Sequence, residues 1–134
     1  MLYTPGFELA SFDFLDTPAK VGVIIALTEA LAQCDYEYLR VKPNTPSLYR
    51  SGVRYKHSCY PLIECRWVDI PRAREVNGDC KDLAAWRVAE LRIAGELDCR
   101  PRVEVRNYPG HIIYHVVVQR ADGTVEDPSK LLGM

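Results

Sequence analysis

The sequence lacks the features that mark several large classes of protein. No run of twenty apolar residues occurs, so we expect no membrane-spanning helix. The opening residues, Met-Leu-Tyr-Thr-Pro-Gly, have neither the basic nor the apolar segment of a signal peptide. The net charge of -1 gives no electrostatic reason to expect nucleic acid or an anionic membrane as a partner. These absences predict a cytoplasmic protein.

Closely spaced cysteine pairs are also missing. The five cysteines stand at positions 34, 59, 65, 80 and 99, with no C-x-x-C pair. An odd, irregular set of this kind is typical of reduced thiols. A zinc site built from His57, Cys59, Cys65 and a fourth residue is an alternative, but the usual paired ligands are absent. We therefore expect no metal and no cofactor.

What is present fits one domain over residues 1–134. Apolar residues make up 48% and charged residues 26%, which is ordinary for a globular chain. We expect residues 1–16 to form an irregular N-terminal arm that packs on the core. Thr17-Pro18 predicts a helix start with a hydroxyl cap, and an apolar stripe continues at helical spacing to about Cys34.

The middle and the end of the chain differ in character. Four prolines between residues 40 and 75 predict loops, with short strands near residues 53–55 and 61–68. A helix is predicted from about Cys80 to Ala94, because Asp79 is a good cap and Gly95 a good stop. We expect its buried side to carry Leu83, Ala84, Trp86, Val88 and Leu91, and its solvated side Arg87, Glu90 and Arg92. Three strands are predicted after it, at residues 102–106, 112–120 and 124–127.

Cys80 is the candidate nucleophile of the chain. Unpaired amides and partial positive charge at a helix start lower a thiol pKa, and the same amides could hold an oxyanion. Asp79 and Asp82 oppose this effect unless they turn away, and they are explained equally well as caps. We expect Lys81 to face solvent. Asn77 is either an oxyanion donor or, as we favour, a turn residue.

His115 is the candidate base, and Asp127 the candidate residue that orients it. A histidine among β-branched residues is often only a packed core residue, so the hairpin after it provides a test. A two-residue turn at Asp122-Gly123 would pair Val118 with Asp127 and put Asp127 on the face opposite His115. A three-residue turn with Gly123 in the left-handed conformation pairs residue 117 with Asp127 instead. The two side chains then share a face and lie within reach.

Together these residues resemble a known superfamily. Gly-Asp-Cys-Lys-Asp-Leu-Ala at a helix start, a Tyr-His-Val-Val-Val strand and Glu-Asp-Pro-Ser near the end resemble the transglutaminase-like cysteine enzymes. The resemblance covers roughly residues 70–130. It implies an α+β, papain-like fold in which the cysteine helix packs on an antiparallel sheet, with Cys80, His115 and Asp127 as the triad. Residues 48–55 resemble small stand-alone members from bacteriophages and prophages, which would place the protein in the host cytoplasm or the virion.

The chain also departs from parts of that superfamily. It lacks the extra β-domains and the acidic calcium cluster of large transglutaminases, and no tryptophan stands just before the cysteine. Trp67 is a candidate oxyanion donor or wall residue of the site, but we favour a core role. Lys81-Asp82 follow the cysteine where many cell-wall peptidases have Ser-Gly, which argues against a cell-wall substrate.

The predicted function is cysteine-dependent acyl transfer on amide bonds of a peptide or protein. The outcome would be hydrolysis, deamidation or transamidation through a thioester. One alternative is a non-catalytic structural or assembly protein of a phage particle that binds other phage structural proteins. Another is acyl transfer from a thioester cofactor to an arylamine, for which the chain is short. The sequence leaves the substrate and the oligomeric state open.

Overall fold

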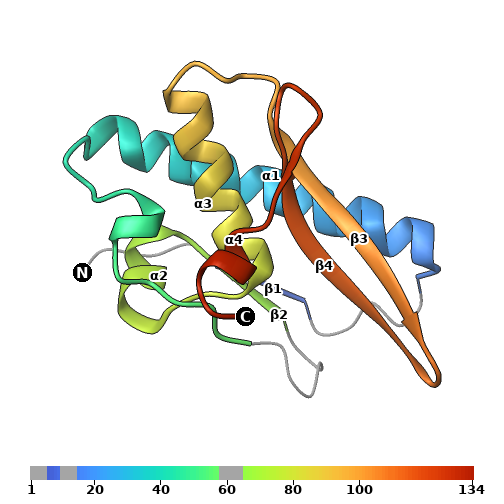
Figure 1. Ribbon diagram of the computed structural model, residues 1–134. Coiled ribbons are helices and arrows are strands. Elements are labelled where there is room, and N and C mark those ends of the chain that lie inside the picture. The colour runs from blue at the N-terminus through green and yellow to red at the C-terminus, as the bar shows by residue number, and fades with distance from the viewer. Residues whose placement is uncertain (1–5, 10–14, 58–64) are drawn as a thin grey trace.

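The protein has a mixed α+β fold in a computed structural model that describes residues 6–9, 15–57 and 65–134 (Figure 1). These residues form two small antiparallel sheets, one of two strands and one of three. The elements in chain order are β1 (Gly6–Leu9), α1 (Thr17–Val41), the 3-10 turn η1 (Leu48–Arg50), β2 (Cys65–Val68), α2 (Ile70–Val76), α3 (Cys80–Ile93), β3 (Arg100–Tyr108), β4 (His111–Gln119), β5 (Val125–Glu126) and α4 (Pro128–Leu131).

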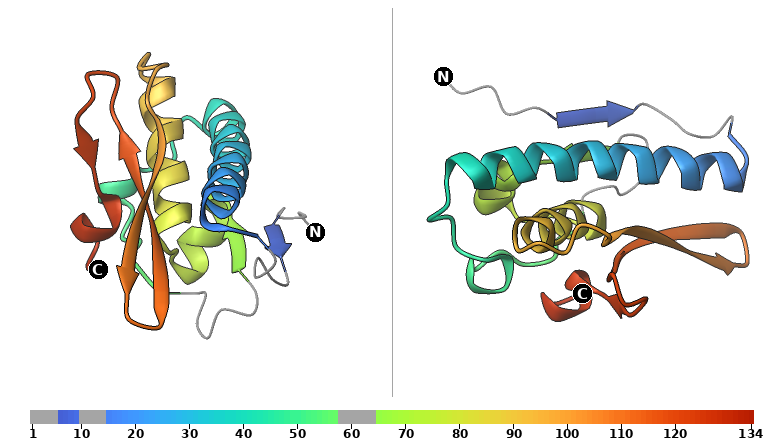
Figure 2. Two further views of the ribbon diagram at one scale, coloured as in Figure 1. Left: turned by 90° about the vertical axis from the view of Figure 1, so that its right-hand side faces the viewer. Right: turned by 90° about the horizontal axis from the view of Figure 1, so that it is seen from above.

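Helix α3 is the central layer of the molecule. It lies between α1 on one side and the β3-β4-β5 sheet on the other (Figure 2). Its small and aliphatic residues let both neighbours approach closely, and the five residues that we expected on its buried side are buried. The main core cluster joins the three layers and contains Ile24, Leu31, Ala32, Trp67, Ala84, Ala85, Val88, Leu91, Cys99, Val116 and Val118.

Helix α1 begins where we predicted and ends later. Its cap is Asp16 rather than a hydroxyl, because a carboxylate oxygen of Asp16 accepts the backbone N–H of Ala19 at 2.9 Å. The helix continues past Cys34 to Val41 and stops just before Pro43, which disfavours helical backbone at the residue before it. The apolar stripe alone did not reveal the last two turns of α1, because the fully buried residue there is an aspartate, Asp35, and not an apolar residue.

Helices α2 and α4 were not predicted, because we took Pro71 as a breaker of structure and Asp127-Pro128 as the end of a strand. Pro71 and Pro128 instead stand in the first turn of a helix, where the missing N–H has no cost. Asp69 and Asp127 precede them as caps. The strand expected at residues 53–55 is absent, and Tyr55 makes only an isolated parallel bridge with Gly78.

The hairpin between β4 and β5 has the register of the three-residue turn, not that of the two-residue turn. Val118 pairs with Glu126 and Gln119 with Val125. The Arg120 N–H donates to the Thr124 carbonyl at 2.7 Å, and Gly123 has φ +89°. The loop therefore has three residues, and the same pairing continued by one residue sets position 117 opposite Asp127.

The N-terminal arm is partly regular. Residues 6–9 form β1 and pair antiparallel with β2, so the expectation of an irregular arm is wrong there. The rest of the arm before residue 15 lies outside the described residues, as do positions 58–64 with Cys59 and half of the strand predicted at 61–68. Within the described ranges, no helix combines the length and apolar character needed to cross a bilayer.

Candidate active site

Cys80 is the first residue of α3, as predicted, and its side chain is partly buried. The Asp82 carboxylate fixes this helix start, because one oxygen accepts the Asp79 N–H at 3.1 Å and the other accepts the Val68 N–H at 2.9 Å. Gly78 is required just before it, since an added Cβ would lie 2.9 Å from that of Asp82. The start of α3 is thereby tied to strand β2.

Lys81 does not face solvent, so that expectation is wrong. Only 5% of the residue is exposed, and its Nζ lies 2.5 Å from an Asp79 carboxylate oxygen and 4.0 Å from one of Asp82. The ammonium also lies over the Trp67 ring, 4.9 Å from the centroid. A buried carboxylate pair is tolerated in a protein interior only with a cation nearby, and Lys81 is that cation.

The charge around Cys80 corrects the predicted activation of the thiol. Burial, and after it the negative charge of Asp79, raise the pKa of Cys80 to about 12. A hydrogen bond from the Val116 backbone amide and the charge of Lys81 lower that pKa, but by less. The helix start therefore does not produce a resting thiolate, because burial of the thiol and the negative charge of the capping carboxylates outweigh its partial positive charge.

His115 and Asp127 lie together as the three-residue hairpin loop requires. Nε2 of His115 is 2.8 Å from Oδ2 of Asp127, and His115 is only 4% exposed. Because a carboxylate only accepts hydrogen bonds, Nε2 carries the hydrogen and Nδ1 is left as the basic nitrogen. The next residue along β4, Val116, is the one whose amide meets the Cys80 sulfur. Helix α3 and strand β4 thus bring the three predicted site residues into one region.

Asp127 has two partners at once. Its Oδ2 binds His115, while its Oδ1 accepts the Lys130 N–H at 3.3 Å and caps α4. Ser129, in the same helix, is fully buried. The Asp-Pro-Ser sequence therefore starts a helix whose cap faces the histidine, a role that Asp-Pro indicates locally and that we did not recognise.

An ionic network next to the site was missed. Glu126 accepts hydrogen bonds from the Tyr49 hydroxyl, from Arg87 (Nε to Oε2, 2.5 Å) and from Arg120 (3.0 Å). These donors lower the pKa of Glu126 although burial opposes them. The network fixes β5 immediately before Asp127. Its members are far apart in the sequence, so no local pattern announces it.

The expectation of a solvated side of α3 at Arg87, Glu90 and Arg92 is wrong. Arg87 binds Glu126, Arg92 binds Glu29 at 2.9 Å, and Glu90 accepts the Leu48 N–H at 2.7 Å. All three side chains are partly buried. Long side chains on this face are used to attach α1, η1 and β5 to the central helix.

Two other candidates have ordinary structural roles. Asn77 ends α2 with φ +69°, and its side chain accepts the Arg54 N–H at 3.0 Å, which makes it the turn residue that we favoured. Trp67 is 1% exposed in the core, and its Nε1 donates to the Thr28 hydroxyl at 3.4 Å.

The two remaining histidines are exposed, unlike His115. His57 is exposed, and His111 stacks on Tyr108 near the hairpin turn. Among the described residues, no group of three or more histidine, cysteine, aspartate or glutamate side chains is arranged to hold a metal ion.

Comparison of the chain with protein-family models, with curated proteins and with solved structures gives no match.

Proposed function

We propose that this protein is a cysteine-dependent acyl-transfer enzyme of the transglutaminase-like, papain-like kind, acting on amide bonds of peptides or proteins. The observation that carries the proposal is the 2.8 Å hydrogen bond from His115 to Asp127 on the strand whose next amide meets the Cys80 sulfur. An oriented imidazole with its second nitrogen unprotonated is what a thiol nucleophile needs as a base.

The reaction begins with the thiol in its neutral form. The Cys80 sulfur attacks the amide carbonyl carbon while Nδ1 of His115 takes the thiol proton. The imidazolium, stabilised by Asp127, then gives this proton to the leaving nitrogen, the C–N bond breaks, and a thioester remains. Water attacks the thioester with His115 again as the base, which releases the acid and restores the thiol. An amine in place of water gives transamidation, and a glutamine side chain as substrate gives deamidation.

The raised pKa of Cys80 decides when the proton moves. A thiol with a pKa of about 12 is protonated at neutral pH, so proton transfer accompanies the attack rather than preceding it. The first-turn amides of α3 are the proposed oxyanion donors, because they lie at the helix end that favours negative charge.

A second function is favoured by a specific observation and is kept beside the first. A neutral, partly buried thiol next to a buried Asp79–Lys81 pair is also what a structural helix start requires. The protein would then be a non-catalytic assembly protein, for example of a phage particle, in which Cys80 packs and His115 only joins β4 to α4.

The pH dependence of Cys80 alkylation by iodoacetamide separates the two functions. Mass spectrometry would follow Cys80 and Cys34 in the wild type, in His115→Ala and in His111→Ala, an exposed histidine of the same strand. An enzyme should show a component of Cys80 labelling at neutral pH that is lost in His115→Ala and kept in His111→Ala. If Cys80 labels no faster than Cys34 and both variants match the wild type, the assembly role replaces the enzymatic one.

A further inference from the structure

Strand β4 has one edge that is mostly open. It pairs with β3 along its whole length, from Tyr108↔His111 to Arg100↔Gln119. On the other side β5 pairs only with Val118 and Gln119. Among the described residues, the stretch from His111 to Val117 has no strand on that side (Figure 1).

The hairpin hydrogen bonds show which backbone amides of β4 point toward β5 and which point toward β3. The Arg120 N–H points toward β5, since it donates to the Thr124 carbonyl at 2.7 Å. Strand amides alternate in direction, so residues 112, 114 and 116 point to the same side. The odd residues point to β3, in agreement with His111 facing Tyr108 across a two-residue turn.

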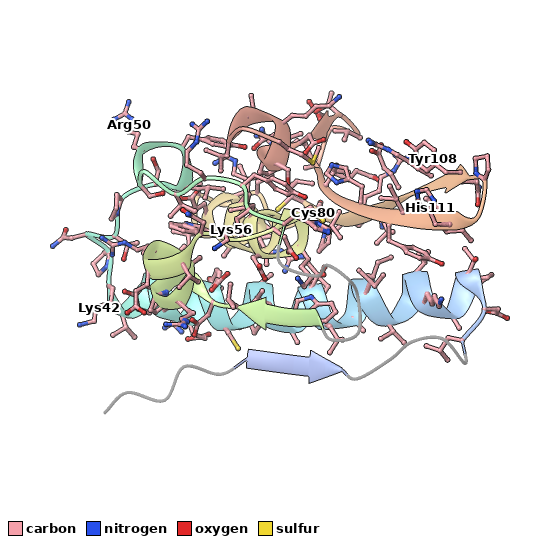
Figure 3. The ribbon with its side chains drawn as sticks, turned by 90° about the horizontal axis from the view of Figure 1, so that it is seen from below. Lys42, Arg50, Lys56, Cys80, Tyr108 and His111 are labelled. Atoms are coloured by element: carbon pink, nitrogen blue, oxygen red, sulfur yellow. The ribbon has the colours of Figure 1, made fainter. Side chains whose placement is uncertain are left out.

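The open edge leads directly to the thiol. The first of its amides next to β5, that of Val116, is the one bonded to the Cys80 sulfur. The amides of Tyr114 and Ile112 continue the row toward the hairpin turn. Figure 3 shows Cys80 near the middle of the molecule and the stacked Tyr108 and His111 at the far end of the hairpin, and the row runs between these two points.

We propose that a substrate peptide binds in extended form as an added strand on this edge of β4, pairing with the backbone of Ile112 and Tyr114. This inference rests on the proposed acyl-transfer function. Strand addition uses main-chain hydrogen bonds for affinity and leaves alternate side chains to set preference. It places the peptide carbonyl that follows the paired stretch at the Cys80 sulfur.

A peptide fits this edge better than a second copy of the chain. The unpaired stretch ends at the thiol, and β5 blocks the strand beyond it. An occupant therefore has a short paired segment followed by a group at Cys80, as a peptide substrate has. Ile112 and Ile113, on opposite faces of the strand, are 40% and 43% exposed, so apolar side chains are favoured at neighbouring positions of the peptide.

The test uses a covalent peptide probe, acetyl-Ala-Val-Ala vinyl sulfone, with methyl vinyl sulfone as the matched probe without a peptide. In both, a thiol sulfur adds to the vinyl carbon β to the sulfone, which carries the peptide in the first probe, and the thiol proton goes to the carbon beside the sulfone. Mass spectrometry identifies the labelled cysteine, and NMR then follows hydrogen exchange of single backbone amides. We expect exchange at Ile112 and Tyr114 to be at least tenfold slower with the peptide probe than with methyl vinyl sulfone. Exchange at Ile113 and His115, which already bind β3, should not change.

The outcomes separate this inference from the proposed function. Labelling of Cys80 without protection of Ile112 and Tyr114 overturns strand addition and leaves the acyl-transfer function standing. No labelling of Cys80 by either probe overturns both. Protection of the same amides in the unlabelled protein that grows with protein concentration assigns the edge to a second copy and also overturns the inference.

Peptides with one methylated amide give a second measurement that does not alter the protein. Two probes differ only in which of two consecutive amides carries the methyl group. Because alternate amides of an added strand point toward β4, one probe should label Cys80 about tenfold more slowly and the other at the parent rate. Equal rates for the two probes contradict pairing along the edge.

Discussion

The starts of α3 and α4 present the same cap residue in two different environments. Asp79 at α3 is buried with Lys81 and raises the pKa of Cys80. Asp127 at α4 is less buried, and it shares its oxygens between the helix and His115. The comparison shows that an aspartate cap does not by itself indicate a function. Burial and the group within its reach decide whether it suppresses a nucleophile or orients a base.

The largest expected effect comes from removing the cation at α3. Lys81→Met leaves Asp79 and Asp82 buried without a positive charge, which should lower the free energy of unfolding by about 3–5 kcal/mol. Urea denaturation measures it. The control is Arg72→Met, which removes an exposed pair with Glu75 and should change stability by less than about 0.5 kcal/mol. Equal effects of the two substitutions would mean that the α3 cluster is not a buried charge site.

The next effect concerns the orienting carboxylate at α4. Asp127→Asn should keep most of the stability, because asparagine is an equally good cap. It should lower the His115-dependent reaction of Cys80 by about a hundredfold or more, since the neutral amide no longer stabilises the imidazolium and, with its NH2 turned to Nε2, favours the other tautomer.

The measurement for Asp127→Asn is the rate of Cys80 alkylation at neutral pH together with thermal unfolding. Asp122→Asn is the matched control, because Asp122 lies in the same hairpin and accepts the N–H and the hydroxyl of Thr124. A normal rate in Asp127→Asn with a normal melting curve would remove Asp127 from the site.

The pH dependence of Cys80 labelling tests the effect of Asp79 at the start of α3. Below a pKa of about 12, the thiolate fraction of Cys80 rises tenfold with each pH unit, and so should the labelling rate that does not depend on His115. Asp79→Asn removes the negative charge that raises the pKa of Cys80 most, so this pKa should fall. Labelling of Cys80 at a fixed pH should then become about tenfold faster for each pH unit of the fall. Asp98→Asn, at an exposed acid, should leave the profile in place. Slower labelling of Cys80 in Asp79→Asn would contradict the conclusion that Asp79 raises the pKa of this thiol.

The smallest effect tests the hairpin that delivers Asp127. Gly123 has φ +89°, so Gly123→Ala should cost about 1 kcal/mol of stability. Gly22 lies exposed in α1 with nothing within 4 Å of an added Cβ, and Gly22→Ala should stabilise the protein by up to about 1 kcal/mol. Thermal unfolding of both variants compares them directly, and a Gly123→Ala variant as stable as Gly22→Ala would argue against the three-residue loop.

Local patterns predicted much of the fold and of the site. The helix at Cys80, its buried side and the strand around His115 follow from spacing and caps. Turn chemistry left two hairpin registers open, and the structure has the one with the three-residue loop. These patterns are local because a helix cap or a hairpin register depends on residues a few positions apart. The same local rules were misapplied at Pro71, where a preceding aspartate turns a helix breaker into a helix start, and Asp127-Pro128 was not recognised as an equivalent helix start.

The sequence by itself determined the helix that begins at Cys80 and the strand that carries His115, because both depend on contacts between near neighbours. It limited the hairpin after His115 to two registers, one of which sets His115 beside Asp127. Only the tertiary structure decided that Lys81 is buried, that Glu126 collects three donors and that the pKa of Cys80 is raised. The physical reason is that desolvation and Coulomb interaction depend on everything packed around a group. Around Cys80 those neighbours come from α3, β2 and β4, which meet only when the chain is folded.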